Sequence, residues 1–90
     1  MRIDKSSRKG KKYMIVYKGK TIHFGQEGAS DYTIHKDPKR KEAYINRHKK
    51  RENWTKSGAN TAGFWSRWIL WNEPISPEQN MIKVHKKFNI

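Results

Sequence analysis

Cationic side chains are the most abundant chemically active groups in this sequence. Of its 90 residues, 21 are Lys or Arg and 8 are Asp or Glu, so the formal net charge is +13. A small domain with this excess repels itself unless a polyanion lies close by. Nucleic acid is the commonest such partner, followed by an anionic membrane or an acidic protein surface. The alternative, a basic protein without such a partner, is disfavoured because the charges are clustered.

The cations gather in two stretches that we predict to bind phosphate. One is residues 1–12, and the other is a predicted helix over residues 37–52 that carries its cations on one side. The acids Glu42 and Glu52 are too few to neutralise that side, which argues against an ordinary solvated face. No base-reading motif is present, so we expect phosphate contacts without sequence preference. The candidate nucleic-acid-binding residues are Lys9, Lys11, Lys12, Lys39, Arg40, Arg47, Lys50 and Arg51.

Groups suited to catalysis or metal binding are sparse. The histidines are His23, His35, His48 and His85, and no two of them have the close spacing of metal ligands on one helix. We interpret them as half-buried hydrogen-bonding side chains. The carboxylates are too few for a divalent-ion site, and the sequence has no phosphate-binding glycine loop. We therefore predict no catalytic residue, no metal site and no cofactor, and a protein that is not an enzyme; an enzyme acting on nucleic acid is a disfavoured alternative.

Four tryptophans in a chain of this size have two interpretations. Aromatic rings interleaved with cations can stack on unpaired bases. Trp65, Trp68 and Trp71 instead recur at helical spacing among apolar residues, which favours a hydrophobic core. Trp54 stands apart beside cations and is the better candidate for exposure, although we favour packing there too. The predicted structural core consists of Phe64, Trp65, Trp68, Ile69 and Trp71.

The elements that would position these residues indicate an α+β fold. Residues 13–17 and 21–24 have the composition of two strands joined by a turn at residues 18–20. Asp37 and Pro38 suit the start of the helix over residues 37–52. Further helices are predicted over residues 61–72 and 76–88, the last with a capping box at Ser76. We expect an N-terminal basic arm and a β-hairpin, followed by three helices around a Trp-rich core.

The chain has the length of one domain. We predict a flexible basic arm over residues 1–12, where Ser6, Ser7 and Gly10 break any periodicity, and a single small α+β domain over residues 13–90. Cysteine is absent, so no disulfide can form. The N-terminus lacks the apolar core of a signal peptide. The longest apolar stretch is far shorter than the roughly 20 residues of a membrane-spanning helix.

Three runs of sequence are distinctive enough to compare with known families. They are residues 31–37 (DYTIHKD), 47–54 (RHKKRENW) and 58–72 (GANTAGFWSRWILWN). Together they resemble a small family of basic proteins from large eukaryotic DNA viruses, the giant viruses, whose function is uncharacterised. The resemblance extends over residues 30–88. It implies a small viral protein packaged in the virion and present in the host cytoplasm or nucleus during assembly. It brings no known active site.

Charge and resemblance together lead to two hypotheses. The first is a non-catalytic, virion-associated basic protein that binds nucleic acid, with double-stranded DNA as the expected ligand, and so neutralises or packages the genome. The second is a minor capsid or structural protein that bridges capsid proteins and an anionic inner membrane. An open strand edge would suit insertion into a protein lattice, whereas the lack of a base-reading motif suits phosphate binding. We favour the first, and expect neither a small-molecule substrate nor a transmembrane segment.

Overall fold

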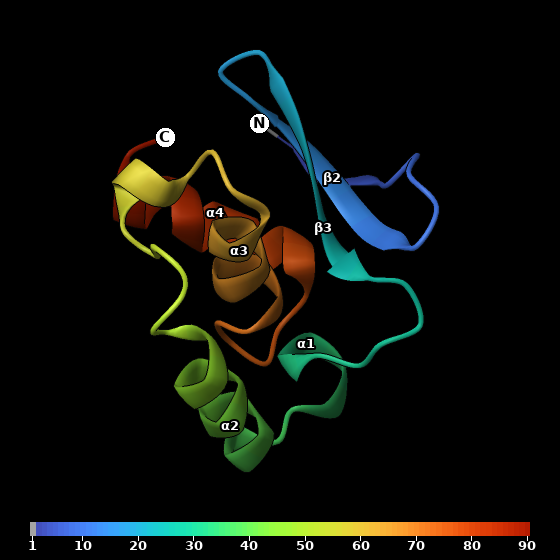
Figure 1. The fold of residues 1–90 in the computed structure, drawn as a ribbon, viewed down its shortest axis with the longest axis vertical. Coiled ribbons are helices and arrows are strands. Elements are labelled where there is room, and N and C mark those ends of the chain that lie inside the picture. Colours follow the sequence, from blue (N-terminus) through green and yellow to red (C-terminus); the bar gives the residue numbers. More distant parts are fainter. Residues whose placement is uncertain (1) are drawn as a thin grey trace.

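The computed structural model describes residues 2–90, so Met1 of the predicted arm lies outside the described residues. An N-terminal three-stranded antiparallel sheet is followed by helices, which confirms the predicted α+β class. Figure 1 shows the sheet beside the helices α3 and α4, while α1 and α2 lie at the other end of the molecule. Within residues 2–90, none of the helices combines the length and the apolar character needed to cross a bilayer.

The predicted hairpin consists of β2 (Lys11–Tyr17) and β3 (Lys20–Gln26). Its turn residues Lys18 and Gly19 both have positive φ angles, 48° and 78°, and this conformation matches the twist of paired strands. The register sets Ile15 opposite Ile22. Both side chains are buried in the core. The alternation of inward and outward residues thus places one face of the hairpin on the helices.

The N-terminal segment differs from the predicted flexible arm. Asp4–Lys5 forms a short strand, β1, which pairs antiparallel with β2. Ile3 packs against the core, and the Ser6 hydroxyl lies 2.7 Å from Nδ1 of His23. Two residues are too short for a visible alternation pattern, and the edge of β2 supplies the pairing that makes them a strand. Of the predicted arm, residues 4, 5, 11 and 12 are therefore part of the sheet.

The helices flanking the Trp-rich segment begin where their caps predict. α2 (Pro38–His48) starts after Asp37, whose side chain accepts a hydrogen bond from the backbone N–H of Lys39 at 2.9 Å. α2 ends at His48, before the predicted residue 52. α4 (Pro77–Phe88) starts at Ser76 with the predicted capping box. A further short helix, α1 (Tyr32–His35), lies within the segment predicted to be irregular.

The predicted helix over residues 61–72 changes its winding halfway. It begins as α3 (Ala62–Trp65) and continues as η2 (Ser66–Leu70), one turn of π-helix in which the N–H of Trp71 bonds to the carbonyl of Ser66 at 3.2 Å. A short 3-10 turn, η1 (Lys56–Gly58), precedes it. The wider π turn shifts the phase of the side chains that follow it. Phe64, Trp65 and Ile69 are fully buried, whereas Trp68 and Trp71 are partly buried and pack against the core.

Candidate nucleic-acid interface

Few of the cations are neutralised by ion pairs. Within residues 2–90, Arg2 and Lys12 are the only Lys or Arg side chains at ion-pair distance from a carboxylate, those of Asp4 and Asp31 respectively. The carboxylate of Glu52 lies 3.0 Å from Nδ1 of His48. The remaining Lys and Arg side chains in the described part of the chain have no carboxylate at this distance. Their uncompensated charge creates a positive potential that attracts polyanions.

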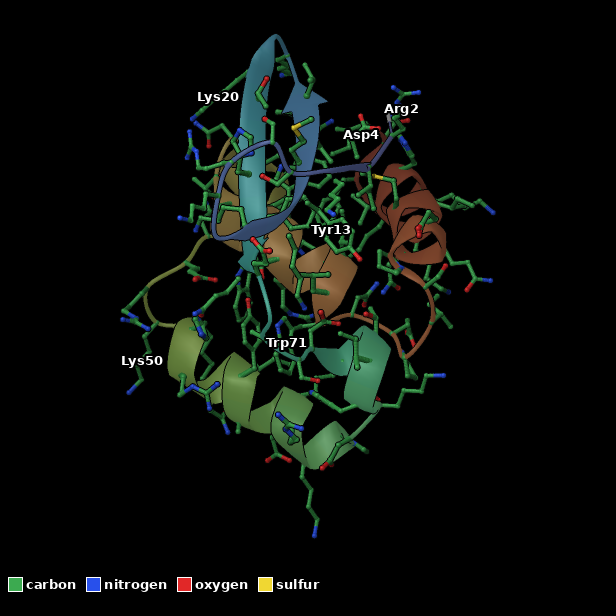
Figure 2. The ribbon with its side chains drawn as sticks, turned by 90° about the vertical axis from the view of Figure 1, so that its right-hand side faces the viewer. Arg2, Asp4, Tyr13, Lys20, Lys50 and Trp71 are labelled. Carbon is green, nitrogen blue, oxygen red and sulfur yellow. The ribbon has the colours of Figure 1, made fainter. Side chains whose placement is uncertain are left out.

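The cations of residues 37–52 that we predicted to bind nucleic acid are all exposed. They lie on two consecutive elements, because α2 ends at His48 and the chain continues in a turn. Figure 2 shows Lys50 beyond the end of α2, and Trp71 between α2 and the sheet. We call this set the α2 cations; it consists of Lys39, Arg40, Arg47, Lys50 and Arg51.

The cations of residues 1–12 that we predicted to bind nucleic acid fall into two groups. Lys9 and Lys11 are exposed. Nζ of Lys12 instead lies 2.7 Å from Oδ2 of Asp31, and the two side chains are only 15% and 3% exposed. This pair fastens β2 to the start of α1, so we assign Lys12 a structural role. The sequence offered no sign of the pair because it depends on tertiary folding.

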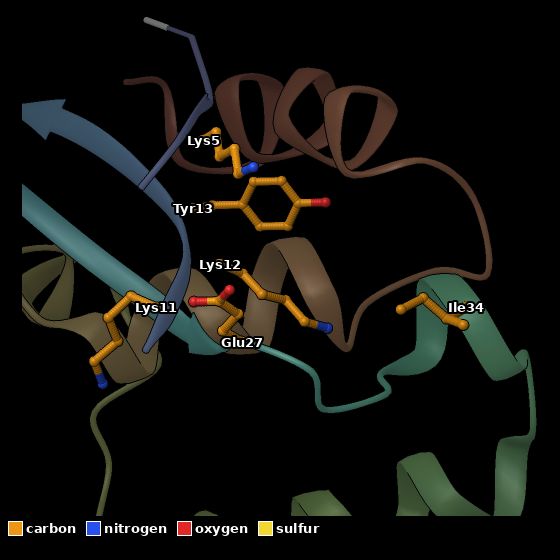
Figure 3. Close-up of a pocket in the computed structure, with 6 residues that line it drawn as sticks. All are labelled: Lys5, Lys11, Lys12, Tyr13, Glu27 and Ile34. Carbon is orange, nitrogen blue, oxygen red and sulfur yellow. The ribbon is translucent and has the colours of Figure 1, made fainter. Parts of the chain in front are cut away.

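A hollow of 440 Å³ lies between the sheet and α1. Figure 3 shows the side chains around it, with the hydroxyl of Tyr13 and the ammonium of Lys12 directed toward the same side as Ile34. Burial, together with the nearby charges of Asp31 and Glu78, raises the pKa of Tyr13. Its hydroxyl is therefore a neutral donor at physiological pH. The hollow is lined by Lys5, Lys11, Lys12, Tyr13, Glu27 and Ile34.

A second hollow, of 420 Å³, lies between α2 and the loop before α1. Arg40 and Arg47 are two helical turns apart on α2, which separates their Cα atoms by about 10.5 Å along the axis. Ala43 stands between them and leaves the space open because its side chain is a single methyl group. We call this the α2 hollow; its lining residues are Ala29, Ser30, Arg40, Ala43, Arg47 and Trp71.

A smaller hollow of 220 Å³ adjoins the α2 hollow, sharing Ala29, Ser30 and Trp71. Its wall includes the rings of Tyr44 and His48. The ring of Tyr44 contacts both the ring of His48 and the ring of Trp71, which also lines this hollow. The Tyr44 ring lies 4.3 Å from the Trp71 ring at 3°, and 4.3 Å from the His48 ring at 25°.

Tyr44 is held neutral in this stack. Burial, assisted by the charge of Glu52, raises its pKa to about 12, although a hydrogen bond with Ser66 and the positive charges of Arg67 and Arg47 act in the opposite direction. A phenol with this pKa is protonated throughout the physiological range. Tyr44 therefore contributes a rigid uncharged ring rather than an acid or a base.

One further arginine, which the sequence analysis did not single out, is part of the scaffold. The guanidinium of Arg67 lies 4.4 Å from the ring of Trp68 and 5.4 Å from that of Trp54, and it donates to the carbonyl of Trp71 at 2.8 Å. Burial lowers its pKa. These contacts hold the backbone of Trp71 in place. Trp54 is itself half-buried, with its indole N–H donating to Glu52 at 2.8 Å.

The histidines are engaged separately rather than as a cluster. Nδ1 of His35 accepts a hydrogen bond from the N–H of Asp37 at 2.9 Å, while His23 and His48 contact Ser6 and Glu52 respectively. His85 bonds to the carbonyl of Ile90. Among the residues that the structure describes, no three His, Asp or Glu side chains are grouped so that they could hold a metal ion.

Comparison with known families finds one match. The model of a family described as "Family of unknown function (DUF5754)" matches residues 1–48, which is more than half of the chain. The matched part contains the sheet, α1 and α2. The match shares residues 30–48 with the resemblance described in the sequence analysis, and it also includes residues 1–29. No curated protein and no solved structure matches the chain.

Proposed function

For this chain, which belongs to a family of unknown function (DUF5754), we propose the role of a non-catalytic basic protein that binds nucleic acid through phosphate contacts. One observation carries the proposal: the α2 cations are exposed, and within residues 2–90 none of them has a carboxylate at ion-pair distance. A helix that served only as a solvated surface would gain stability from acids placed one turn from its cations.

The arrangement of the α2 cations suits a phosphate backbone. Arg40 and Arg47 project from an ordered helix, so the backbone that carries them is in place before a ligand arrives. A guanidinium can donate two parallel hydrogen bonds to one phosphate, which makes arginine a strong phosphate ligand. Each phosphate contact also releases condensed counterions, which favours binding without regard to base sequence. We propose double-stranded DNA as the principal ligand.

We further propose that this binding neutralises or packages a viral genome within the particle. The support is the resemblance of residues 31–37, 47–54 and 58–72 to basic proteins of large DNA viruses. Gentle disruption of virions tests it, because a genome-binding protein should remain with the released DNA. Recovery of the protein with the emptied shell would contradict this location and would favour the structural alternative.

The salt dependence of binding tests the phosphate contacts directly. Fluorescence anisotropy of a labelled random-sequence duplex, titrated with the protein at increasing salt, should give a linear plot of log K against log salt, with a slope of about −0.9 per phosphate neutralised. Scrambling the duplex sequence should leave the affinity unchanged. A flat salt response would contradict the proposal.

Vesicles provide the matched control for other polyanions. Phosphatidylserine vesicles and uncharged phosphatidylcholine vesicles are offered to the protein under the same conditions as the duplex. Tight binding to the anionic vesicles with no binding to the duplex would overturn the nucleic-acid role and would favour a protein that contacts an anionic inner membrane.

A further inference from the structure

We propose that the α2 hollow binds an unpaired nucleotide, with its base against Trp71 and its phosphates at Arg40 and Arg47. The proposal rests on the nucleic-acid function above and names a second form of ligand, a nucleobase that is not held in a duplex. Such a nucleotide could be free or part of a single strand, and the two share the same chemistry of an aromatic base next to a phosphate.

Trp71 supplies the aromatic surface. Its ring is stacked on the buried Tyr44 ring at 4.3 Å and contacts the His35 ring at 5.3 Å, so its orientation is fixed by packing. Its remaining accessible surface lines both the α2 hollow and the adjoining smaller one. A ring that is already immobile loses little entropy when a base stacks on it. Stacking of this kind tolerates any base, because every base has a π face.

Arg40 and Arg47 supply the charge. Both line the α2 hollow, and neither has a carboxylate at ion-pair distance within residues 2–90. Asp31, which lines the adjoining hollow, does not oppose an anion strongly, because its carboxylate is already paired with Lys12 and accepts from the N–H of Thr33 at 2.9 Å. Cations at the rim and an aromatic ring in the wall are the combination that single-strand binding surfaces use.

The space fits a nucleotide and excludes a duplex. The 420 Å³ of the α2 hollow lies in the range of small-ligand sites, and the adjoining hollow adds 220 Å³ beside it. A base inside a duplex could enter only if it were flipped out of the stack, which costs unpairing and unstacking energy. Single strands and duplexes should therefore respond differently when the α2 hollow is filled, although both use the α2 cations.

The substitution Ala43→Leu fills the α2 hollow without changing a charge. Ala43 is exposed on α2, and leucine is a good helix former, so the variant should fold. The matched control is Asn46→Leu, which adds the same side chain at an exposed position of α2 that lines neither hollow. Both are titrated with labelled oligothymidine, an abasic oligomer of equal length and a duplex, at one salt concentration.

Ala43→Leu should weaken the binding of oligothymidine about tenfold, while the abasic oligomer and the duplex change less than about twofold. Asn46→Leu should affect none of the three. Adenosine monophosphate is then added as a competitor of oligothymidine. Displacement shows that the site accepts a free nucleotide; its failure, with the Ala43→Leu effect present, shows that the site needs a strand. Either result supports the proposal.

Two results would overturn the inference. The first is an unchanged affinity of Ala43→Leu for oligothymidine, and the second is an equal loss for the abasic oligomer, which would assign the effect to phosphate contacts. Both would leave duplex binding by the parent protein, and hence the proposed function, intact. If the parent bound none of the three ligands, the proposed function would fail and the inference with it.

Discussion

The rings of Tyr44 and Trp71 lie parallel, with an angle of 3° and a centroid separation of 4.3 Å. Tyr44 is the buried residue of α2, and Trp71 follows η2, which packs against α4 and β3. The contact therefore connects α2, which carries exposed cations, with the core of the domain. The positions of Arg40 and Arg47 relative to the rest of the surface depend on it.

The raised pKa of Tyr44 predicts a loss of stability in alkali. Because the pKa is about 12 in the folded state and near 10.0 in the unfolded state, the unfolded state ionises first. The stabilisation is fully present below pH 10 and is lost as the pH rises towards 12, by roughly 2–3 kcal/mol in total. Urea unfolding between about pH 9 and pH 11 should show about half of this loss, because the folded-state pKa of Tyr44 is about 12. Tyr44→Phe should lose distinctly less stability over the same range, and an identical pH dependence in both proteins would contradict the assignment.

The ion pair between Lys12 and Asp31 predicts an asymmetric response to substitution. Asp31→Asn leaves the ammonium of Lys12 largely buried without a counter-charge, which should destabilise the fold by roughly 3–5 kcal/mol. Lys12→Met with Asp31→Asn removes both charges and should recover part of that loss. Urea unfolding of the single and double variants completes the cycle. Strict additivity of the two single effects would show that the pair does not couple β2 to α1.

Burial predicts that two neighbouring tryptophans differ in importance. Trp65 is fully buried, and its indole N–H donates to the carbonyl of Ala59 at 2.6 Å, so Trp65→Ala should cost roughly 3–5 kcal/mol. That approaches the whole stability of a small domain. Trp68 is partly exposed, so Trp68→Ala should cost clearly less. Thermal unfolding followed by circular dichroism compares the two, and a lower melting temperature for the Trp68 variant would contradict the expectation.

The parts of the fold that sequence predicts are those set by neighbouring residues. Asp37 with Pro38 marks the start of α2, and Ser76 with Gln79 marks the start of α4, because capping involves residues only a few positions apart. β1 instead depends on a distant partner, because its two residues form a strand only by pairing with β2. The π turn of η2 is likewise not represented by an α-helical wheel. Trp68, which the sequence analysis placed in the core, packs against it and is partly buried.

The candidate site also has one part that the sequence predicts and one part that it does not. The α2 cations are visible in the sequence because charge is a property of each residue. The α2 hollow is not, because its walls come from the loop at Ala29, from α2 and from Trp71, which only the fold brings together. Ala43 in particular has no chemistry that a pattern could detect. Its importance lies in the space that a methyl group leaves unoccupied.

The last prediction concerns which cations dominate duplex binding. Two variants remove four positive charges each, all from exposed side chains. The first replaces Arg40, Arg47, Lys50 and Arg51 by Gln, and the second replaces Lys5, Arg8, Lys9 and Lys11 by Gln. Because the net charge is equal in the two variants, long-range attraction to DNA is reduced equally, and any difference in affinity reflects the local geometry of the contacts.

The first variant should bind a random-sequence duplex more weakly than the second. It loses three guanidinium groups, each able to donate two hydrogen bonds to one phosphate, whereas the second loses one. Circular dichroism should show parent-like helix content in both, because Gln is a good helix former. Anisotropy titrations at one fixed salt concentration compare the affinities. If the second variant bound more weakly, the binding surface would lie on the N-terminal edge of the sheet, and the α2 cations would be a solvated face.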